Sequence, residues 1–188
     1  MIYGEKVILG PVERYHLPIM VEYRNDPDLR KYFREYRLLS LENQTQWWED
    51  KILKKDPSWI YFVIYPKDNS KHVIGMTGLT YMHPVYRNGE FAIVIGDKDY
   101  RRKGLGEDSL KALIRYGFND LNLHRIDCEV FANNTSIVLY RKLGFVDEGT
   151  LRDRYYWDGN FWDSYILSLL RHEFDKQQWS RERFGKEL

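Results

Sequence analysis

The sequence predicts an α+β fold with a mixed, mostly antiparallel sheet of about seven strands, flanking helices and a central strand–loop–helix–strand unit. Its length of 188 residues is that of one domain and is sufficient to bury a core. The elements follow in the order strand, two helices, three strands, helix, strand, helix, two strands, which is typical of α+β proteins. After residue 95 the apolar period changes from that of strands to that of a helix, which marks the central unit.

The first half of the chain predicts a strand, two helices and three further strands. A strand at residues 7–9 is followed by a helix at 16–24, whose first turn tolerates Pro18. Ser40 is the expected N-cap of the second helix, which continues to about residue 55. Apolar, β-branched and aromatic runs predict the three strands. These runs are residues 59–65, 73–81 and 90–95.

The second half opens with an amphipathic helix that begins near Leu105 and is recognised by apolar residues at helical spacing. Gly144 is a fitting C-cap for a short helix, and Asp158-Gly159 is a common hairpin turn between the last strands. The expected elements are a strand at 125–131, a helix at 135–144, strands at 145–156 and 161–170, and a charged tail at 171–188, helical at first and then frayed.

Composition excludes several classes of function. A formal charge of +1 is too balanced for a protein that binds nucleic acid through bulk electrostatics. Cys128 is the only cysteine, so the chain has no intrachain disulfide and no cysteine cluster for zinc, and a reducing cytoplasm fits best. Because neither a signal-peptide core nor a run of about 18 apolar residues is present, we expect a soluble protein without a membrane or metal partner.

A basic, glycine-containing loop lies between the strand that ends at residue 95 and the helix that follows. It consists of Arg101, Arg102, Lys103, Gly104, Leu105 and Gly106. Glycines let a backbone approach a ligand closely, and the first N–H groups of a helix have no partner inside it, so the loop suits a pyrophosphate. Glu107, the next residue, is included among the expected cofactor-binding residues; its side chain suits the helix dipole but would repel a phosphate placed near it. A solvated basic turn is the alternative interpretation of the same residues.

Together with a second motif, the loop resembles the GNAT superfamily of N-acetyltransferases, whose Q/R-x-x-G-x-G/A segment binds the pyrophosphate of CoA. In the second motif an asparagine, here Asn133, is followed seven residues later by Tyr140 and then by Gly144-Phe145. Residues 90–170 resemble the branch that contains ribosomal-protein and spermidine N-acetyltransferases. The resemblance implies a GNAT fold and an enzyme that moves acetyl from acetyl-CoA to an amine.

The resemblance also implies a single N-acetyltransferase domain over residues 1–188. Within it, residues 1–58 are expected to form acceptor-side helices, and residues 90–145 the acetyl-CoA-binding core. In the family, backbone amides from the strand before the loop hold the pantetheine and acetyl groups. In this sequence the corresponding residues are Val94, Ile95 and Gly96, and the glycine is compatible with a bulge or break in the strand.

The resemblance assigns Asn133 to the pantetheine arm and Tyr140 to its sulfur. If both lay in one helix, they would project on nearly the same face, about 10 Å apart along the axis. Full proton transfer from a tyrosine to a thiolate is uphill by about 2 kcal/mol, so hydrogen-bond donation is the expected role. Glu129 is the candidate general base, with Glu90 in reserve, and a solvated strand face is the alternative.

We expect direct attack of the amine on acetyl-CoA, without an acyl-enzyme on Cys128. The acceptor is a primary amine, either a protein N-terminus or a small molecule such as an amino sugar. Residues 30–37 carry four cations and one carboxylate, which disfavours a polyamine without excluding it. A catalytically weak acyl-CoA sensor is the alternative function. The aromatic segments at 47–48, 155–157 and 161–162 suit core packing, a homodimer seam or an acceptor cleft.

Overall fold

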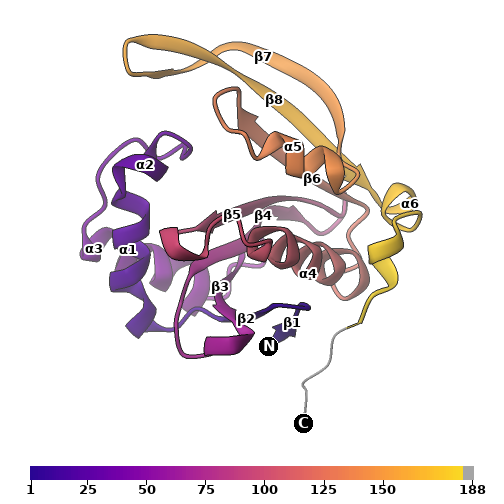
Figure 1. Cartoon of the computed structure of the whole chain (residues 1–188), viewed down its shortest axis with the longest axis horizontal. Coiled ribbons are helices and arrows are strands. Elements are labelled where there is room, and N and C mark those ends of the chain that lie inside the picture. Colours follow the sequence, from indigo (N-terminus) through magenta and orange to yellow (C-terminus); the bar gives the residue numbers. More distant parts are fainter. Residues whose placement is uncertain (184–188) are drawn as a thin grey trace.

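An eight-stranded sheet runs through residues 1–183, the part of the chain that the computed structural model describes (Figure 1). The strand order is β1-β2-β3-β4-β5-β6-β8-β7, and every neighbouring pair is antiparallel except β5 and β6. The strands are β1 (Ile2–Tyr3), β2 (Val7–Pro11), β3 (Ile60–Pro66), β4 (Gly75–His83), β5 (Asn88–Ile95), β6 (Arg125–Phe131), β7 (Val146–Trp157) and β8 (Asn160–Leu170).

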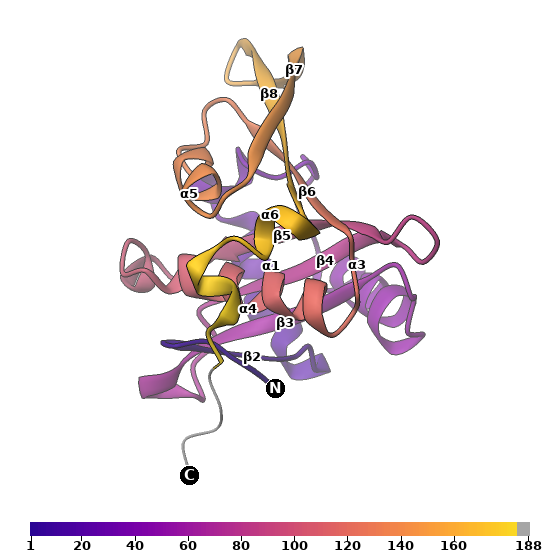
Figure 2. The same ribbon diagram turned by 90° about the vertical axis from the view of Figure 1, so that its right-hand side faces the viewer.

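Helices cover both faces of this sheet (Figures 1 and 2). They are α1 (Leu17–Asn25), α2 (Pro27–Arg30), α3 (Leu41–Trp47), α4 (Leu105–Asn119), α5 (Ile137–Lys142) and α6 (Arg171–Phe174). On one face, Leu17 and Met20 of α1 pack with Val63 and Met76 of the sheet in one apolar cluster. On the other face, α4 buries its apolar stripe in the larger cluster, because its apolar residues recur at helical spacing. The sheet therefore separates an α1–α3 face from an α4 face.

The predicted α+β class with a mixed, mostly antiparallel sheet is confirmed. The described residues contain eight strands rather than about seven, because β1 is only two residues long and too short to leave a pattern. Ser40 caps α3 as expected, with its side chain accepting a hydrogen bond from the Asn43 amide. The helix then passes into a π-helical segment, Trp48–Leu53. The tail forms α6 and a 3-10 turn, Gln178–Arg181, and residues 184–188 of the tail lie outside the described residues.

The parallel pair at the centre of the sheet is only partly formed. Asn88, Gly89 and Glu90 pair with the first residues of β6, after which no pairing joins the two strands. Residues 91–95 of β5 and 128–131 of β6 therefore diverge, and their facing backbone groups are not joined in a ladder. The opening between these two diverging segments is called the splay below, and it lies between the two faces of the sheet.

Asp108, in the first turn of α4, fastens the start of the chain to this helix. Its buried carboxylate accepts hydrogen bonds from the amides of Glu5, Lys6 and Val7, at 2.9, 2.8 and 3.0 Å. A side chain on Gly4 would collide with the same carboxylate. Since the N-terminal segment would otherwise have unpaired amides at its entry into β2, Asp108 fixes both its course and its distance from α4.

Candidate active site

A cleft of about 1190 Å³ passes through the splay and joins the two faces of the sheet. The strands β5 and β6 border the cleft, and they contribute Glu90 and Glu129, respectively, to its lining. One end is lined by the loop before α4 and the segment before α5, and the other end by the segment between α2 and α3. The sequence-predicted residues among the lining are Glu90, Val94, Ile95, Arg101, Arg102, Gly104, Gly106, Glu107, Glu129 and Tyr140.

The start of α4 forms an anion-binding geometry at one end of the cleft. Gly104 is the N-cap in a left-handed conformation, with φ of 81°, and no side chain caps the helix. Gly104, Gly106 and Glu107 line the cleft, so the uncapped start of α4 borders it and suits the pyrophosphate of CoA. Arg102 lines the cleft and is exposed. Leu105 is instead buried in the core, and Lys103 lies over the Tyr100 ring outside the lining.

Arg101 has a different role from the one suggested by the run of three cations. Its guanidinium donates to the carbonyl oxygens of Ile95, at 3.0 Å, and Gly96, at 2.6 Å. A further contact of 3.3 Å joins it to the Asp26 carboxylate at the end of α1. These bonds hold the end of β5 against the turn, so that much of the guanidinium is committed to protein groups rather than directed at a phosphate.

The expected repulsion between Glu107 and a phosphate is offset by neighbouring ammonium groups. The Glu107 carboxylate accepts from Lys142 at 2.7 Å and pairs with Lys111 at 3.2 Å. The hydrogen bond from Lys142 is the main cause of a lowered pKa for Glu107, and burial opposes it. The carboxylate is thus ionised, but the two ammonium groups balance its negative charge. The dipole of α4 and the Arg102 guanidinium therefore set a positive electrostatic potential at this end of the cleft.

The prediction that Gly96 offers a backbone amide to the ligand was wrong. Its N–H donates to the Ile74 carbonyl at 2.9 Å, because the antiparallel register with β4 continues one residue past the strand. Amides alternate in direction along a strand, so the Val94 amide also faces β4, and Ile95 is the one of the three whose N–H faces the splay. Gly96 is instead required by packing, since a Cβ there would lie 2.0 Å from the Tyr23 ring.

Tyr140 and Cys128 both lie on the α4 side of the splay and line the cleft. Tyr140 is only 7% exposed, and burial, with a smaller effect of Cys128, raises its pKa. Its phenol therefore remains a protonated hydrogen-bond donor at neutral pH. Burial also raises the pKa of the Cys128 thiol far above its ordinary value, which suppresses the nucleophilic thiolate.

Asn133 and Tyr140 do not share a helix, so the common face expected of two residues on one helix does not apply to them. Helix α5 begins only at Ile137, and Asn133 lies in the turn that leads away from β6. The turn forms because the Asn134 side chain accepts from the Ser136 amide and its own amide bonds to Phe131. Among the described residues the Asn133 Oδ1 is buried without a hydrogen-bond partner. The cleft is lined instead by three residues that the sequence did not single out, namely Asn134, Thr135 and Ser136.

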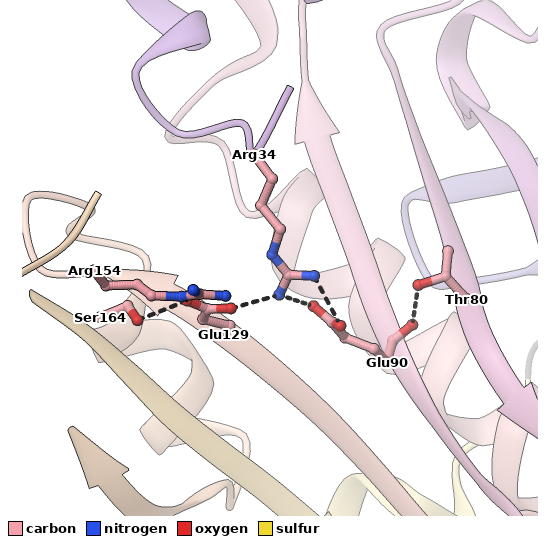
Figure 3. A network of polar contacts seen from close by, with 6 residues as sticks. All are labelled: Arg34, Thr80, Glu90, Glu129, Arg154 and Ser164. Atoms are coloured by element: carbon pink, nitrogen blue, oxygen red, sulfur yellow. Dashed lines mark hydrogen bonds and ion pairs between the residues drawn. The ribbon is translucent and has the colours of Figure 1, made fainter. Parts of the chain in front are cut away.

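On the other side of the splay, Glu90 and Glu129 share one guanidinium, that of Arg34 (Figure 3). Residues 126, 128 and 130 of β6 pack into the α4-face core, so the alternation of the strand directs Glu129 to the α1–α3 face. Glu90 points to that face as well, since its neighbour Phe91 is in the same core. The two carboxylates are thus held on the face opposite Tyr140.

Glu129 is further restrained by Ser164 and Arg154, which donate to its Oε1 at 2.7 and 3.0 Å. Burial raises the pKa of Glu129, but the bond from Ser164 and the cations of Arg154 and Arg34 outweigh it and lower the pKa below its ordinary value. A carboxylate so stabilised in its charged form is a weak proton acceptor. The arrangement therefore does not support Glu129 as a general base.

Aromatic side chains line the cleft near Arg34, and only one of the predicted aromatic segments contributes to them. These side chains are Tyr32, Phe33, Trp47, Trp59, Tyr61 and Tyr81. Trp48 donates instead to the Val12 carbonyl and packs against the α1-face cluster. Tyr155 stacks on Phe131, while Tyr156 and Phe161 pair on the exposed hairpin.

Residues 1–183 contain no group of three or more His, Cys, Asp or Glu residues that could hold a metal ion. None of the helices in this part of the chain is both long and apolar enough to cross a membrane.

Comparison with known proteins agrees with this architecture. The chain is similar to the spermidine N(1)-acetyltransferases of Vibrio cholerae, with 26% identity over 91% of this chain and 96% of the relative, and of Escherichia coli K12, with 28% identity over 91% and 89%. A crystal structure of the Vibrio cholerae spermidine N-acetyltransferase with CoA and spermine superposes with a TM-score of 0.82, at 25% identity over 90% of this chain and 98% of that one.

The family model described as the acetyltransferase (GNAT) domain matches residues 6–146. This range includes the loop before α4, the splay and Tyr140, which are the parts from which the donor end of the cleft is built. The chain therefore belongs to the GNAT family and is an N-acetyltransferase that uses acetyl-CoA as its acetyl donor.

Proposed function

We propose that this enzyme transfers acetyl from acetyl-CoA directly to a primary amine of low pKa, such as a protein N-terminus or an amino sugar. The observation that carries the proposal is the engagement of both candidate bases. Glu90 and Glu129 are held by Arg34, at 2.5 and 3.2 Å, and the pKa of Glu129 is lowered. Glu35, which also lines the cleft, is paired with Arg37 at 2.7 Å, and the hydrogen bond from Arg37 lowers its pKa to about 2. Among the described residues, the acceptor end of the cleft therefore offers no carboxylate poised to take a proton.

The energetic consequence depends on the acceptor. Neutralising an aliphatic amine of pKa near 10 at pH 7 costs about 4 kcal/mol, whereas a peptide N-terminus of pKa near 8 costs about 1 kcal/mol. An acceptor of low pKa is already partly neutral and needs only water in the cleft to carry its proton away. This class of amine thus fits a site without a strong base.

At the donor end of the cleft, different groups bind the pyrophosphate, face the acetyl group and stabilise the leaving sulfur. The amides at the start of α4 and the Arg102 side chain hold the pyrophosphate, and the Ile95 amide faces the pantetheine and acetyl group. The amine attacks the thioester carbon, the C–S bond breaks, and the electron pair leaves on the CoA sulfur. Tyr140 donates a hydrogen bond to that sulfur, and the proton lost by the amine passes to water.

A polyamine is the second candidate acceptor, favoured by the similarity to spermidine N-acetyltransferases. Mass spectrometry separates the candidates after incubation with acetyl-CoA and a panel of N-terminal peptides, amino sugars and spermidine, with Tyr140→Phe as the matched control of low activity. We expect products from acceptors of low pKa. Products from spermidine alone would replace the proposal by the second candidate. No product from any amine, despite CoA binding, would establish a catalytically weak acyl-CoA sensor instead.

Self-association is part of the proposal. One related Vibrio cholerae enzyme has a dodecameric structure, with a TM-score of 0.79 at 23% identity. In this chain β7 lies at the edge of the sheet and is exposed along most of its length, on a hairpin that projects from the body of the protein (Figures 1 and 2). An unpaired strand edge of this kind suits a homodimer contact.

A further inference from the structure

We propose that Arg34 determines acceptor specificity by placing the enzyme's own guanidinium on the Glu90–Glu129 pair and thereby excluding polycationic amines. The inference rests on the proposed function and deepens it. Without Arg34, two carboxylates on neighbouring strands would face the acceptor end of the cleft, which is the arrangement that an ammonium group binds. In the structure, the Arg34 guanidinium occupies the position between the two carboxylates that an ammonium group would otherwise take.

The contacts of Arg34 occupy both carboxylates at once (Figure 3). Its Nη2 lies 2.5 Å from Glu90 Oε1 and 3.2 Å from Glu129 Oε2, and its Nη1 donates to Glu90 Oε2 at 3.0 Å. The bond to Glu90 is bidentate, which is the strongest geometry that an arginine offers. An ammonium group has no planar pair of donors with which to replace it.

Glu129 is held independently of Arg34, because Arg154 and Ser164 donate to its other oxygen, at 3.0 and 2.7 Å. Both carboxylate oxygens of Glu90 contact Arg34, while the Thr80 hydroxyl holds the Glu90 backbone by donating to its carbonyl at 3.2 Å. Loss of the Arg34 side chain would therefore leave an ordered Glu129 carboxylate, with Glu90 beside it on a paired part of β5.

The backbone that carries Arg34 is also restrained. It belongs to the irregular segment between α2 and α3, whose end is fixed by two hydrogen bonds between the Asn25 side chain and the Leu39 backbone, at 2.7 and 2.9 Å. Within the segment, Arg30 donates to the Tyr36 carbonyl at 3.0 Å. These bonds present Arg34 to the strands as a fixed part of the acceptor cleft.

The local charge explains the direction of the effect. Arg34 and Arg154 neutralise Glu90 and Glu129, so an incoming spermidine meets no net negative charge at this point. Removal of Arg34 leaves two carboxylates against one guanidinium, that of Arg154. Such an excess of negative charge in a cleft attracts a cationic acceptor.

The test is Arg34→Met, compared with Arg14→Met as a control, because Arg14 forms an arginine–glutamate pair with Glu49 outside the cleft. We measure kcat/KM for spermidine and for an N-terminal peptide, and the calorimetric Kd of spermidine for the CoA-loaded protein. Arg34→Met should raise the spermidine-to-peptide ratio of kcat/KM at least tenfold, mainly through KM, and tighten spermidine binding at least tenfold. The control should shift neither value.

The double variant Arg34→Met/Glu90→Gln removes one carboxylate of the vacated pair and should cancel most of the gain. Arg34→Gln provides a second neutral variant if the methionine variant does not fold, as judged by its melting temperature and CoA affinity. Unchanged spermidine affinity in a folded neutral variant overturns the role of Arg34. Because this readout is spermidine binding, it remains decisive even if the wild-type protein acetylates no peptide or amino sugar, a result that would overturn the proposed function alone.

Discussion

The ring of Tyr140 packs edge-on against that of Phe91, with centroids 4.9 Å apart and planes at 79°. Phe91 is the first residue of β5 past the pairing with β6, so this contact fixes the phenol beside the splay. Burial raises the pKa of Tyr140, and its neutral form therefore persists beyond the ordinary value of about 10.

Replacement of Tyr140 by phenylalanine keeps this ring contact and removes only the hydroxyl. Because positioned proton or hydrogen-bond donors contribute about 10²-fold or more to rate, we expect kcat to fall by about that factor. The dissociation constant of CoA, measured by calorimetry, should change by less than about threefold. A wild-type rate that declines between pH 8 and pH 9.5 through a group lost in Tyr140→Phe would contradict the raised pKa.

Cys128 should be dispensable for chemistry. The residue is 3% exposed, and burial raises the pKa of its thiol, so that it supplies almost no thiolate. We expect Cys128→Ala to retain kcat within about fivefold, with a modest loss of stability from the small cavity. Steady-state rates and intact-protein mass spectra check both points. Loss of turnover with CoA binding preserved, or an acetylated wild-type protein, would indicate an acyl-enzyme and overturn direct transfer.

Arg101 and Arg102 are neighbours with different expected effects. Arg101→Met removes the bonds to Ile95 and Gly96 and should lower the free energy of unfolding by about 1 to 3 kcal/mol. Arg102→Met should leave stability unchanged but weaken CoA binding several-fold, and less so in high salt. Urea unfolding and calorimetry at two salt concentrations separate them. Equal effects of both variants on stability would show that Arg101 does not hold the end of β5 in place.

Asp108→Ala should be among the most destabilising polar substitutions in the chain. It leaves the amides of Glu5, Lys6 and Val7 without their carboxylate acceptor, which we expect to cost about 3 kcal/mol or more. Asp120→Ala, at the exposed end of the same helix, is the control and should cost less than about 1 kcal/mol. Urea denaturation measures both, and similar values for the two variants would refute the anchoring role.

Glu129 should contribute stability that depends on pH in a defined direction. Its pKa is lowered in the folded protein, so its contribution is present above the unfolded pKa of about 4.3 and is lost as pH falls through the folded value. The difference in unfolding free energy between wild type and Glu129→Gln should therefore shrink from pH 6 towards pH 3. A difference that stays constant over this range would mean that the ion pairs do not stabilise the charged form.

Sequence patterns predicted the features that depend on local chemistry. The Ser40 cap, the start of α4 at Leu105 and the strand Arg125–Phe131 each follow from neighbouring residues, and the structure has all three. The short helix predicted from about residue 135 begins only at Ile137, because the Asn134 side chain competes with the helix for the Ser136 amide.

Features that join distant parts of the chain could not be derived in this way. Arg34 lies 56 residues from Glu90 in the chain, and no spacing rule relates the two side chains. The same holds for Arg101 and Asp26, which are 75 residues apart. The sequence contains these charges, but only the fold determines which of them are paired and which remain for a ligand.

The division of the cleft by the sheet has a consequence for how such enzymes diversify. The donor end is built from the start of α4 and from α5, while the acceptor end depends on the segment between α2 and α3. If Arg34 sets the choice of amine as proposed, a change in that early segment would alter the acceptor while the machinery for thioester chemistry is inherited intact. Exchange of this one short loop between relatives would then yield enzymes with new acceptors.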